Sequence, residues 1–308
     1  MKASVIIATY GREECLVDSI RSVLRQDYPD FELIIVDQTA RHQPEVENFL
    51  RNLDDPRYSY FLVNPPSLPA ARNFGLSKAS GEIVIFIDDD IALEPGFIQG
   101  HIDTYGQSEK IGAVSGRVHV PGLELDGYHF RFSEDGGSSG DFDRPDEADV
   151  HTARGCNMSF RVSLLKAIGQ FNPSYEGNAL REETDVCFRL RRLDYRIRYT
   201  PAAALTHFEA PSGGCRETDM WSSMRYYQNE TLFYRRCFTF PVLWLFLVNS
   251  FKSNLWAWKW TALGRKRFKA YITGVSRGVW LSFFPKTLNP VATWQLDRIR
   301  RPAIPEKV

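Results

Sequence analysis

The sequence predicts an α/β protein with a doubly wound, mostly parallel sheet, and two observations support this fold class. Four short runs in the first hundred residues are largely apolar and rich in β-branched side chains, at residues 4–8, 31–36, 58–63 and 82–87. Such runs are typical of strands that are buried on both faces of a parallel sheet. Segments with helical patterns separate the runs, and this alternation predicts repeated strand–helix–strand units.

The remaining elements follow in chain order. Apolar residues recur at helical spacing within residues 16–24 and 46–53, and residues 69–79 also form a predicted helix. Residues 121–150 are rich in Gly, Ser and Asp, which indicates a surface loop or lid. Regular structure resumes near residue 155, a helix is predicted to begin near residue 181, and a strand is predicted over residues 195–200. From about residue 215 the pattern changes to long, aromatic, helical stretches.

Length and composition limit the class of protein. The chain has 308 residues, of which 43% are hydrophobic and 25% charged. These values allow one large domain or two smaller ones, and they exclude a disordered or collagen-like chain. The five cysteines show no paired metal spacing, which argues against a zinc finger or a disulfide framework. No signal-peptide pattern follows Met1, so we expect a cytoplasmic protein.

Charge is distributed unevenly along a chain whose formal net charge is zero. Residues 252–308 hold twelve Lys and Arg residues against two acids, and six of the seven tryptophans lie from residue 244 onward. The apolar run at residues 238–248 is shorter than the roughly 20 residues that a spanning helix needs. Aromatic residues beside a basic segment are typical of peripheral binding to an anionic membrane, and we favour lipid over nucleic acid as the partner. Packing of these aromatics against the rest of the protein is the alternative.

Three adjacent acidic residues, Asp88-Asp89-Asp90, follow the last of the early strands. In open α/β sheets, ligands bind beyond the carboxyl ends of the strands. Adjacent carboxylates repel one another more strongly as water is excluded, so a buried triplet needs a compensating cation. Carboxylate oxygens are suitable ligands for Mg²⁺ or Mn²⁺. The triplet therefore predicts a divalent-metal site, with a solvated acidic turn as the alternative.

A second acidic segment, residues 182–185 (Glu-Glu-Thr-Asp), begins a predicted helix. Acids at this position complement the helix dipole, and one of them is alternatively a general base. His207 follows a predicted strand and is either a metal ligand or a structural residue. Arg72 lies on the helix before the triplet and is a candidate for binding phosphate. No G-x-G-x-x-G, Walker A or G-x-S-x-G motif follows an early strand, which disfavours dinucleotide-binding, P-loop and hydrolase functions.

Six segments together resemble the motifs of the family-2 nucleotide-sugar glycosyltransferases, which have the GT-A fold. They are residues 4–12, Val36-Asp37, residues 71–75, residues 81–90, residues 155–161 and residues 182–185. Each motif is weak alone, whereas six in the family's order are a strong signal. The resemblance covers about residues 1–210. It implies a catalytic domain over residues 1–214, with a nucleotide-binding half (1–100) and an acceptor half (101–214), followed by a helical basic tail (215–308).

The resemblance also implies roles for individual residues. The base, ribose and diphosphate of a nucleotide would be bound by Thr9, Tyr10, Arg12, Asp37, Arg72, Asp88 and Asp89. The metal would be bound chiefly by Asp90, with Asp88 and His207 as further ligands. Glu183 would be the base that deprotonates the acceptor hydroxyl, with Glu182 and Asp185 as alternatives. The family usually has Asp at the position of Glu183, so the side chain here is longer by one methylene.

The implied activity is that of an inverting, metal-dependent glycosyltransferase using Mg²⁺ or Mn²⁺. Its donor would be a nucleoside-diphosphate sugar, and its acceptor a polysaccharide or lipid-linked glycan. With the basic tail, this predicts a peripheral protein on the inner face of the cell membrane that does not bind nucleic acid. A sugar nucleotidyltransferase is one alternative, although residues 8–12 lack the Gly-rich phosphate loop that it needs. A non-catalytic glycan-binding or nucleotide-sugar-binding module is the other.

Overall fold

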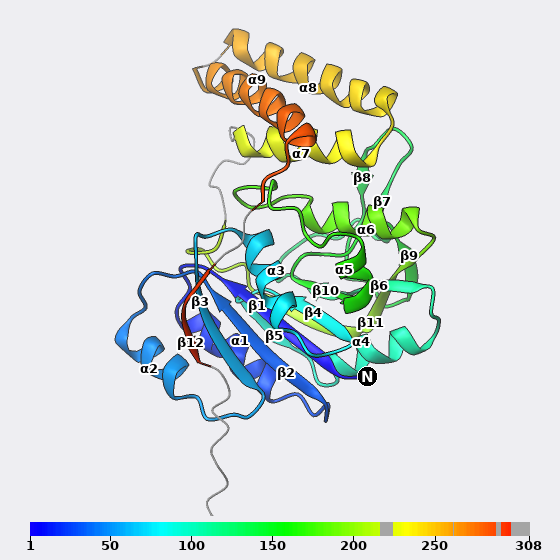
Figure 1. The fold of residues 1–308 in the computed structure, drawn as a ribbon. Coiled ribbons are helices and arrows are strands. Elements are labelled where there is room, and N and C mark those ends of the chain that lie inside the picture. The colour runs from blue at the N-terminus through cyan, green and yellow to red at the C-terminus, as the bar shows by residue number, and fades with distance from the viewer. Residues whose placement is uncertain (216–223, 261, 288–290, 297–308) are drawn as a thin grey trace, which may run out of the picture.

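The computed structural model of the chain describes residues 1–215, 224–260, 262–287 and 291–296. A large sheet with flanking helices forms the lower part of the molecule in Figure 1, and a group of three helices lies above it. The elements in chain order are β1 (Ala3–Thr9), α1 (Glu14–Leu24), β2 (Phe31–Asp37), α2 (Pro44–Asn52), β3 (Tyr58–Asn64), α3 (Leu68–Lys78), β4 (Ile83–Ile87), β5 (Ile91–Leu93), α4 (Phe97–Gly106), β6 (Ile111–His119), β7 (Arg131–Phe132), β8 (Ser138–Ser139), β9 (Ala148–Val150), β10 (Asn157–Arg161), α5 (Val162–Ala167), α6 (Glu182–Arg192), β11 (Arg196–His207), α7 (Met224–Cys237), α8 (Phe240–Trp260), α9 (Ala262–Phe283) and β12 (Val291–Leu296).

The four predicted strands form the parallel half of the sheet, in the order β3-β2-β1-β4. All residues of β2 and β4 are buried, which explains why their sequences do not alternate between apolar and polar residues. Thr9 at the end of β1 pairs in register with Asp37 at the end of β2. Because β4 is also parallel to β1, the chain segments that follow all three strands emerge at one edge. This edge carries Tyr10, Gln38 and the acidic triplet.

The second half of the sheet mixes parallel and antiparallel pairs. Among the described residues the sheet has ten strands, in the order β12-β3-β2-β1-β4-β10-β6-β11-β5, with β9 paired to β11. Strand β10 is antiparallel to β4 and β6, whereas β11 is parallel to β6. Short β5 pairs antiparallel to the end of β11, with Ile91 opposite His207. This register brings His207 beside the acidic triplet that immediately precedes β5.

Helices α7–α9, residues 224–287, form a structure that we call the helical extension. It packs on α6 and on Phe132 of the β7–β8 hairpin through a second hydrophobic core, which is separate from the core around the sheet. Tyr175, Leu232, Phe233 and Leu281 are fully buried there. The long helices predicted from the sequence are therefore present. No described helix combines the length and the apolar character needed to cross a membrane.

Two features were not expected from the sequence. Strand β12 lies beyond the helical extension and pairs antiparallel with β3 at the edge of the large sheet. The chain thus returns to the sheet after α9, where we expected helix alone. The second feature is the β7–β8 hairpin within residues 121–150, which we expected to form a loop. The exposed part of this segment, including Leu123, Leu125 and Tyr128, agrees with the surface position that its composition indicates.

Candidate active site

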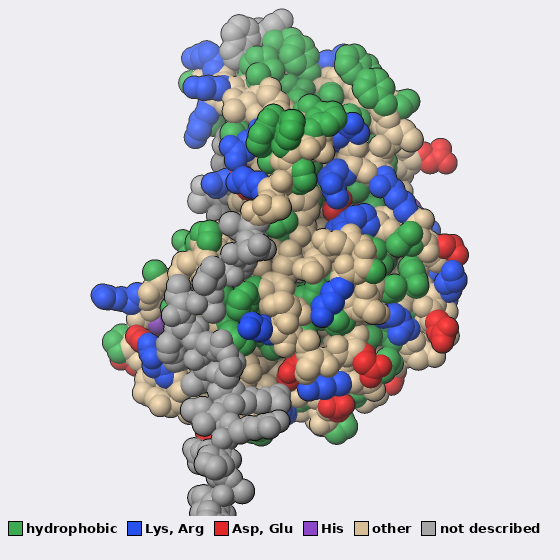
Figure 2. Space-filling model, in the orientation of Figure 1, with side chains coloured by type: hydrophobic (Ala, Val, Ile, Leu, Met, Phe, Trp, Pro, Cys, Tyr) green, Lys and Arg blue, Asp and Glu red, His purple; other side chains and the backbone are tan. Residues whose placement is uncertain are grey.

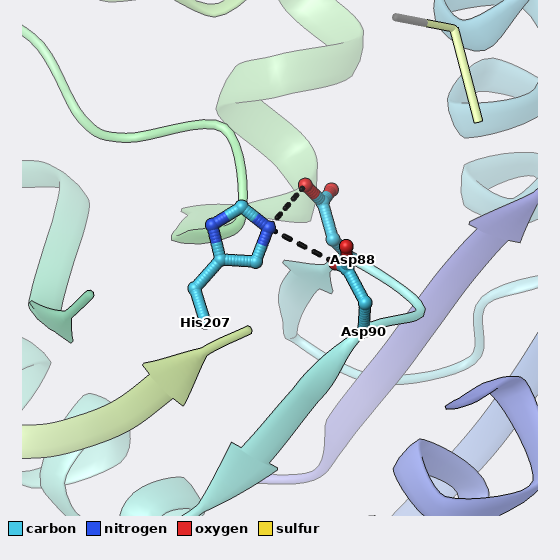
Figure 3. Close-up of side chains that lie close together, drawn as sticks. All are labelled: Asp88, Asp90 and His207. Carbon is cyan, nitrogen blue, oxygen red and sulfur yellow. Dashed lines mark ion pairs between the residues drawn. The ribbon is translucent and has the colours of Figure 1, made fainter. Parts of the chain in front are cut away.

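Three side chains form a potential metal-binding cluster at the edge of the sheet. Oxygen atoms of Asp88 and Asp90 and a ring nitrogen of His207 all lie within 4.8 Å of one another. Figure 3 shows the imidazole facing both carboxylates, with Nε2 2.9 Å from Asp90 Oδ1 and 3.8 Å from Asp88 Oδ2. Asp90 and His207 are buried, whereas Asp88 is partly exposed. Two carboxylates and one imidazole are a donor set that suits Mn²⁺ or Mg²⁺.

The other oxygen of Asp90 is held by the protein. Oδ2 accepts hydrogen bonds from Arg12 Nη2 at 3.2 Å and from the backbone amide of Ala210 at 2.8 Å. Arg12 also pairs with Asp89, so one buried guanidinium bridges two of the three acids. The chain beyond Ala210 approaches the segment that follows β1 so closely that a Cβ on Gly213 would lie 2.0 Å from the Gly11 carbonyl oxygen. Glycine is therefore required at position 213.

The cluster strongly perturbs the acidities of its members. Burial alone would raise the pKa of Asp90, but its hydrogen bond to His207 and the charges of His207 and Arg12 lower the pKa overall. Burial raises the pKa of Asp89 to about 7, against the opposing effects of Thr9 and Arg12. Burial would lower the pKa of His207, yet the bond to Asp90 raises it to about 10. A metal ion would have to displace the His207 proton, as is usual for an imidazole ligand.

Five of the seven residues expected at the nucleotide line a cavity beside this cluster, and Asp37 and Arg72 do not. A hollow of about 160 Å³ is enclosed by Thr9, Tyr10 and Arg12 from the end of β1 together with the acidic triplet, His207 and Cys215. Thr9 is buried and Tyr10 is 42% exposed, so the phenol ring is available for a ligand. The structure thus brings together Thr9, Tyr10, Arg12, Asp88, Asp89, Asp90 and His207 around one space.

Asp37 does not line this cavity. It is fully buried, and both of its oxygens are occupied by neighbours in the protein. Oδ2 accepts the Tyr60 hydroxyl at 2.8 Å and lies 2.6 Å from His42 Nε2, while Oδ1 accepts the Thr39 amide at 2.7 Å. Its neighbour Gln38 reaches the cavity instead. Asp37 therefore fixes the turn after β2 from within.

Arg72 connects the acidic triplet to the second acidic segment. Its side chain is almost completely buried and forms ion pairs with Asp88, at 3.5 Å, and with Glu182. It also donates a hydrogen bond to the Gly155 carbonyl oxygen at 2.9 Å. Because one guanidinium contacts both segments, the metal cluster and the start of α6 lie on adjacent sides of the same site.

The three candidate bases in the second segment have different surroundings. Glu182 is 1% exposed and is neutralised by Arg72. Asp185 is fully buried and pairs with Arg189 and Arg236, each at 3.0 Å. Glu183 alone among the three lines a cavity, a hollow of about 350 Å³ whose walls include the partly exposed segment around Leu123. Of the three acids, Glu183 is therefore the one whose side chain faces open space in the described cavities.

The surroundings of Glu183 make it a stronger base. Burial raises its pKa, while Arg72 and Arg181 oppose the rise. Arg181 is itself neutralised by Glu230 of α7, whose Oε1 lies 2.9 Å from Arg181 Nε. A carboxylate whose pKa is raised toward neutrality is better suited to accept a proton.

Sequence reasoning missed several residues that shape the site. His42 fixes Asp37, and Cys215 and Asn178 line the cavity beside the metal cluster. Glu230 supports Arg181 from a helix about 50 residues further along the chain. Arg181 immediately precedes the acidic pair Glu182-Glu183, so its place in the sequence indicates a position near them. No sequence spacing connects Arg181 with Glu230.

Comparisons with known proteins agree with this architecture. The model of the family "Glycosyl transferase family 2" matches residues 4–169, more than half of the chain. A GalNAc(5)-diNAcBac-PP-undecaprenol beta-1,3-glucosyltransferase of Campylobacter jejuni is 35% identical over 139 residues, which are 41% of this chain and 44% of that protein. A glucosyl-dolichyl phosphate glucuronosyltransferase of Haloferax volcanii is 29% identical over 67% of this chain and 69% of its own.

Solved structures share the fold at low sequence identity. The structure of Staphylococcus aureus TarS in complex with UDP-GlcNAc superposes with a TM-score of 0.58 at 17% identity, over 89% of this chain and 82% of that one. The mannosyltransferase PcManGT of Pyrobaculum calidifontis, solved with GDP-Man and Mn²⁺, gives 0.56 at 15% identity, over 92% and 87%. The fold is thus that of the GT-A nucleotide-sugar transferases. The chain belongs to glycosyl transferase family 2.

Proposed function

We propose that the chain is an inverting, metal-dependent glycosyltransferase that moves a sugar from a nucleoside-diphosphate donor to a hydroxyl group of a polysaccharide or lipid-linked acceptor. Asp90, Asp88 and His207 would hold a divalent cation, Mn²⁺ or Mg²⁺. When bound, that cation stabilises the negative charge that develops on the departing diphosphate. Tyr10 and Gln38 would contact the nucleoside from the end of the parallel strands.

Glu183 would act on the other substrate. Its carboxylate accepts the proton of the acceptor hydroxyl while that oxygen forms a bond to the anomeric carbon and the bond to the diphosphate oxygen breaks. The products are the glycosylated acceptor, the nucleoside diphosphate and a proton on Glu183, which passes to solvent. A single displacement inverts the anomeric configuration.

One observation carries this proposal. Two separate acidic centres face two neighbouring cavities, and Arg72 joins them through Asp88 and Glu182. A direct displacement between two substrates requires one side that binds the metal and the donor, and an opposite side that holds the base and the acceptor. The relatives named above act on undecaprenol-linked and dolichyl-phosphate-linked glycans, which supports a lipid-linked acceptor.

A donor panel tests the proposal. The full chain would be incubated with UDP-, GDP-, dTDP- and ADP-linked sugars, and released nucleoside diphosphate would be measured with Mn²⁺, with Mg²⁺ and with excess chelator. We expect metal-dependent release from at least one donor. Thermal shift provides a second readout, because a matched donor raises the melting temperature only when it binds the native state. Absence of both release and stabilisation across the panel would contradict the proposal.

We also propose that the helical extension rests on the cytoplasmic face of the cell membrane, without crossing it. Figure 2 shows hydrophobic and basic side chains together at the end of the molecule formed by these helices. Trp244 and Trp256 are 59% and 71% exposed, and exposed Arg265 and Lys266 lie on the neighbouring helix α9. Exposed tryptophans beside cations suit the interface of an anionic bilayer. Other aromatics of the extension, such as Phe233, are instead core residues.

Vesicle co-sedimentation tests the membrane proposal. We expect the full chain to bind vesicles that contain phosphatidylglycerol, to bind less as salt rises, and to bind neutral vesicles weakly. The double substitution of Trp244 and Trp256 by Ser should reduce binding, whereas Leu193→Ser, at a side chain 56% exposed on the catalytic domain, should not. Equal binding of all three proteins would refute the proposal. Point substitutions are preferable to truncation, because Leu243 and Leu281 belong to the core shared with α6.

A further inference from the structure

A large cavity lies between the catalytic domain and the helical extension. Its volume is about 850 Å³, within the range of ligand-binding sites. It shares Tyr10, Gln38 and Cys215 with the smaller cavity at the metal cluster, so the two spaces are contiguous. Its wall on the side of the helical extension contains Arg277 of α9 and Lys286, which follows that helix.

A single carboxylate holds both cations at this wall. Glu176 belongs to the segment before α6. Each of its carboxylate oxygens accepts a hydrogen bond from Arg277 Nη2 at 3.1 Å, and the carboxylate also pairs with Lys286. The backbone amide of Lys286 donates to Ser174 Oγ at 2.7 Å, which fixes the start of its side chain. Glu176 is in turn held by a reciprocal pair of bonds with the Asn229 amide group.

These contacts leave the wall with surplus positive charge and unused donors. Among the residues that the structure describes, two cations, Arg277 and Lys286, pair with one carboxylate, Glu176. The Nε–H group of Arg277 is buried and has no acceptor among the residues that the structure describes. The Lys286 ammonium group has three N–H donors. Within the described part of the chain, Glu176 is the only carboxylate that pairs with it. Partly buried guanidinium and ammonium groups with spare donors are suited to binding oxyanions.

We propose that this wall binds a phosphate or carboxylate group of a substrate, with Arg277 and Lys286 as its ligands. The inference rests on the proposed function, because it assigns to one of the two substrates a charged group beyond the donor diphosphate. That group belongs either to an acidic donor sugar or to the phosphate of a lipid-linked acceptor. The helical extension then forms part of the substrate site in addition to any contact with lipid.

Binding to two matched pairs of probes tests this site. Isothermal titration of the full chain with Mn²⁺ would compare UDP-glucuronate with UDP-glucose, and geranyl phosphate with geraniol. We expect the charged member of one pair to bind at least about tenfold more tightly than its neutral partner, as a charge-assisted contact does. The UDP pair identifies the donor as the source of the anion, and the geranyl pair identifies the acceptor. Equal affinity within both pairs would overturn the proposal.

Substitutions test whether the preference for the charged probe depends on this wall of the cavity. Arg277→Gln and Lys286→Gln should each abolish most of the preference for the charged probe, while Lys166→Gln, at an exposed position on α5, should leave it intact. Glu176→Gln releases both cations and should strengthen binding of the charged probe. Misfolding of the wall would instead weaken binding of the charged probe. The Glu176→Gln variant therefore distinguishes anion binding by Arg277 and Lys286 from structural damage. Preference that survives in Arg277→Gln and Lys286→Gln would also contradict the assignment. If geranyl phosphate binds through Arg277 but no nucleotide sugar binds, the anion site stands and the proposed function fails.

Discussion

The acidic triplet after β4 and the acidic start of α6 have similar compositions but different surroundings. In the triplet, Asp88 and Asp90 face one histidine, and they open together onto the cavity beside Tyr10. At the start of α6 the acids are separated from one another by arginines, and only Glu183 reaches a cavity. A shared cation site requires carboxylates that converge, whereas a general base requires one that stands alone. The two acidic segments therefore differ in the side chains that contact each carboxylate in the folded structure. The residues next to each carboxylate in the sequence do not distinguish them.

The largest effect on turnover should come from a substitution in the cluster of Asp88, Asp90 and His207. Asp90→Asn removes a charge that faces His207 and Arg12, and with it the principal proposed metal ligand. We expect turnover to fall on the order of 10³-fold, because a metal contributes several kcal/mol to stabilising the transition state. Steady-state kinetics across a Mn²⁺ titration would measure the loss.

The matched control is Asp18→Asn, which changes a carboxylate 73% exposed on α1 and should leave turnover unchanged. Circular dichroism would confirm that both variants are folded. Full activity of Asp90→Asn, or of the unaltered chain in excess chelator, would show that the triplet is not a metal centre.

Stability should distinguish the acids of the second centre. Asp185 is buried between Arg189 and Arg236, and the second of these belongs to the helical extension. Asp185→Asn should lower the free energy of unfolding by roughly 3 kcal/mol, because breaking a buried ion pair leaves a charge uncompensated. Urea unfolding would measure this change.

The control for this variant is Asp194→Asn, since Asp194 is 92% exposed and pairs with an exposed lysine. Such surface pairs contribute less than about 1 kcal/mol. If Asp185→Asn instead keeps its stability and loses turnover, Asp185 is a catalytic residue and the contrast between it and Glu183 is wrong.

A smaller effect should follow from the support behind Glu183. Glu230→Gln leaves the positive charge of Arg181 without its partner, and that charge stabilises ionised Glu183. The pKa of Glu183 should therefore fall, and the acid limb of the profile of kcat/KM against pH should move to lower pH by less than about one unit. The other charged or titratable groups around Glu183 are Arg72, Arg154, Glu124, Asp126, Asp141 and Cys187.

Arg235→Gln, on the exposed side of the same helix α7, is the control and should leave the profile in place. A shift of the acid limb to higher pH in Glu230→Gln would mean that Arg181 does not act on Glu183. A uniform loss of rate at every pH would indicate a structural role for Glu230 alone.

The parallel half of the sheet was predictable because local pattern determines it. Strands β1, β2 and β4 are buried on both faces, so their apolar runs identified them, and parallel pairing places their carboxyl ends at one edge. The proximity of Asp88, Asp90 and His207 was inferred from the triplet and from the family resemblance. The pairing of β5 with the end of β11 explains physically why His207 lies beside the triplet.

Other features depend on contacts that the sequence pattern does not contain. Strand β12 pairs with β3 across more than 220 residues of chain, and no periodicity near residue 291 indicated a partner. Asp37 was expected to face the nucleotide, yet Tyr60 and His42 occupy its oxygens. We likewise propose Glu183 over Glu182 and Asp185 because arginines from α3, α6 and α7 pair with those two acids. Such long-range pairs become visible only in the folded chain.

The central claim is that the two centres divide the reaction, with Asp90 serving the donor and Glu183 serving the acceptor. The most direct test measures kcat and the donor dissociation constant in Glu183→Gln and Glu182→Gln side by side, with Mn²⁺ present. We predict that Glu183→Gln lowers kcat about 10²–10⁴-fold while donor affinity stays within about twofold, since only the proton acceptor is lost. Glu182→Gln should disturb Arg72 and weaken donor affinity. A Glu183→Gln variant that keeps its kcat, while Glu182→Gln loses turnover at unchanged donor affinity, would contradict the claim.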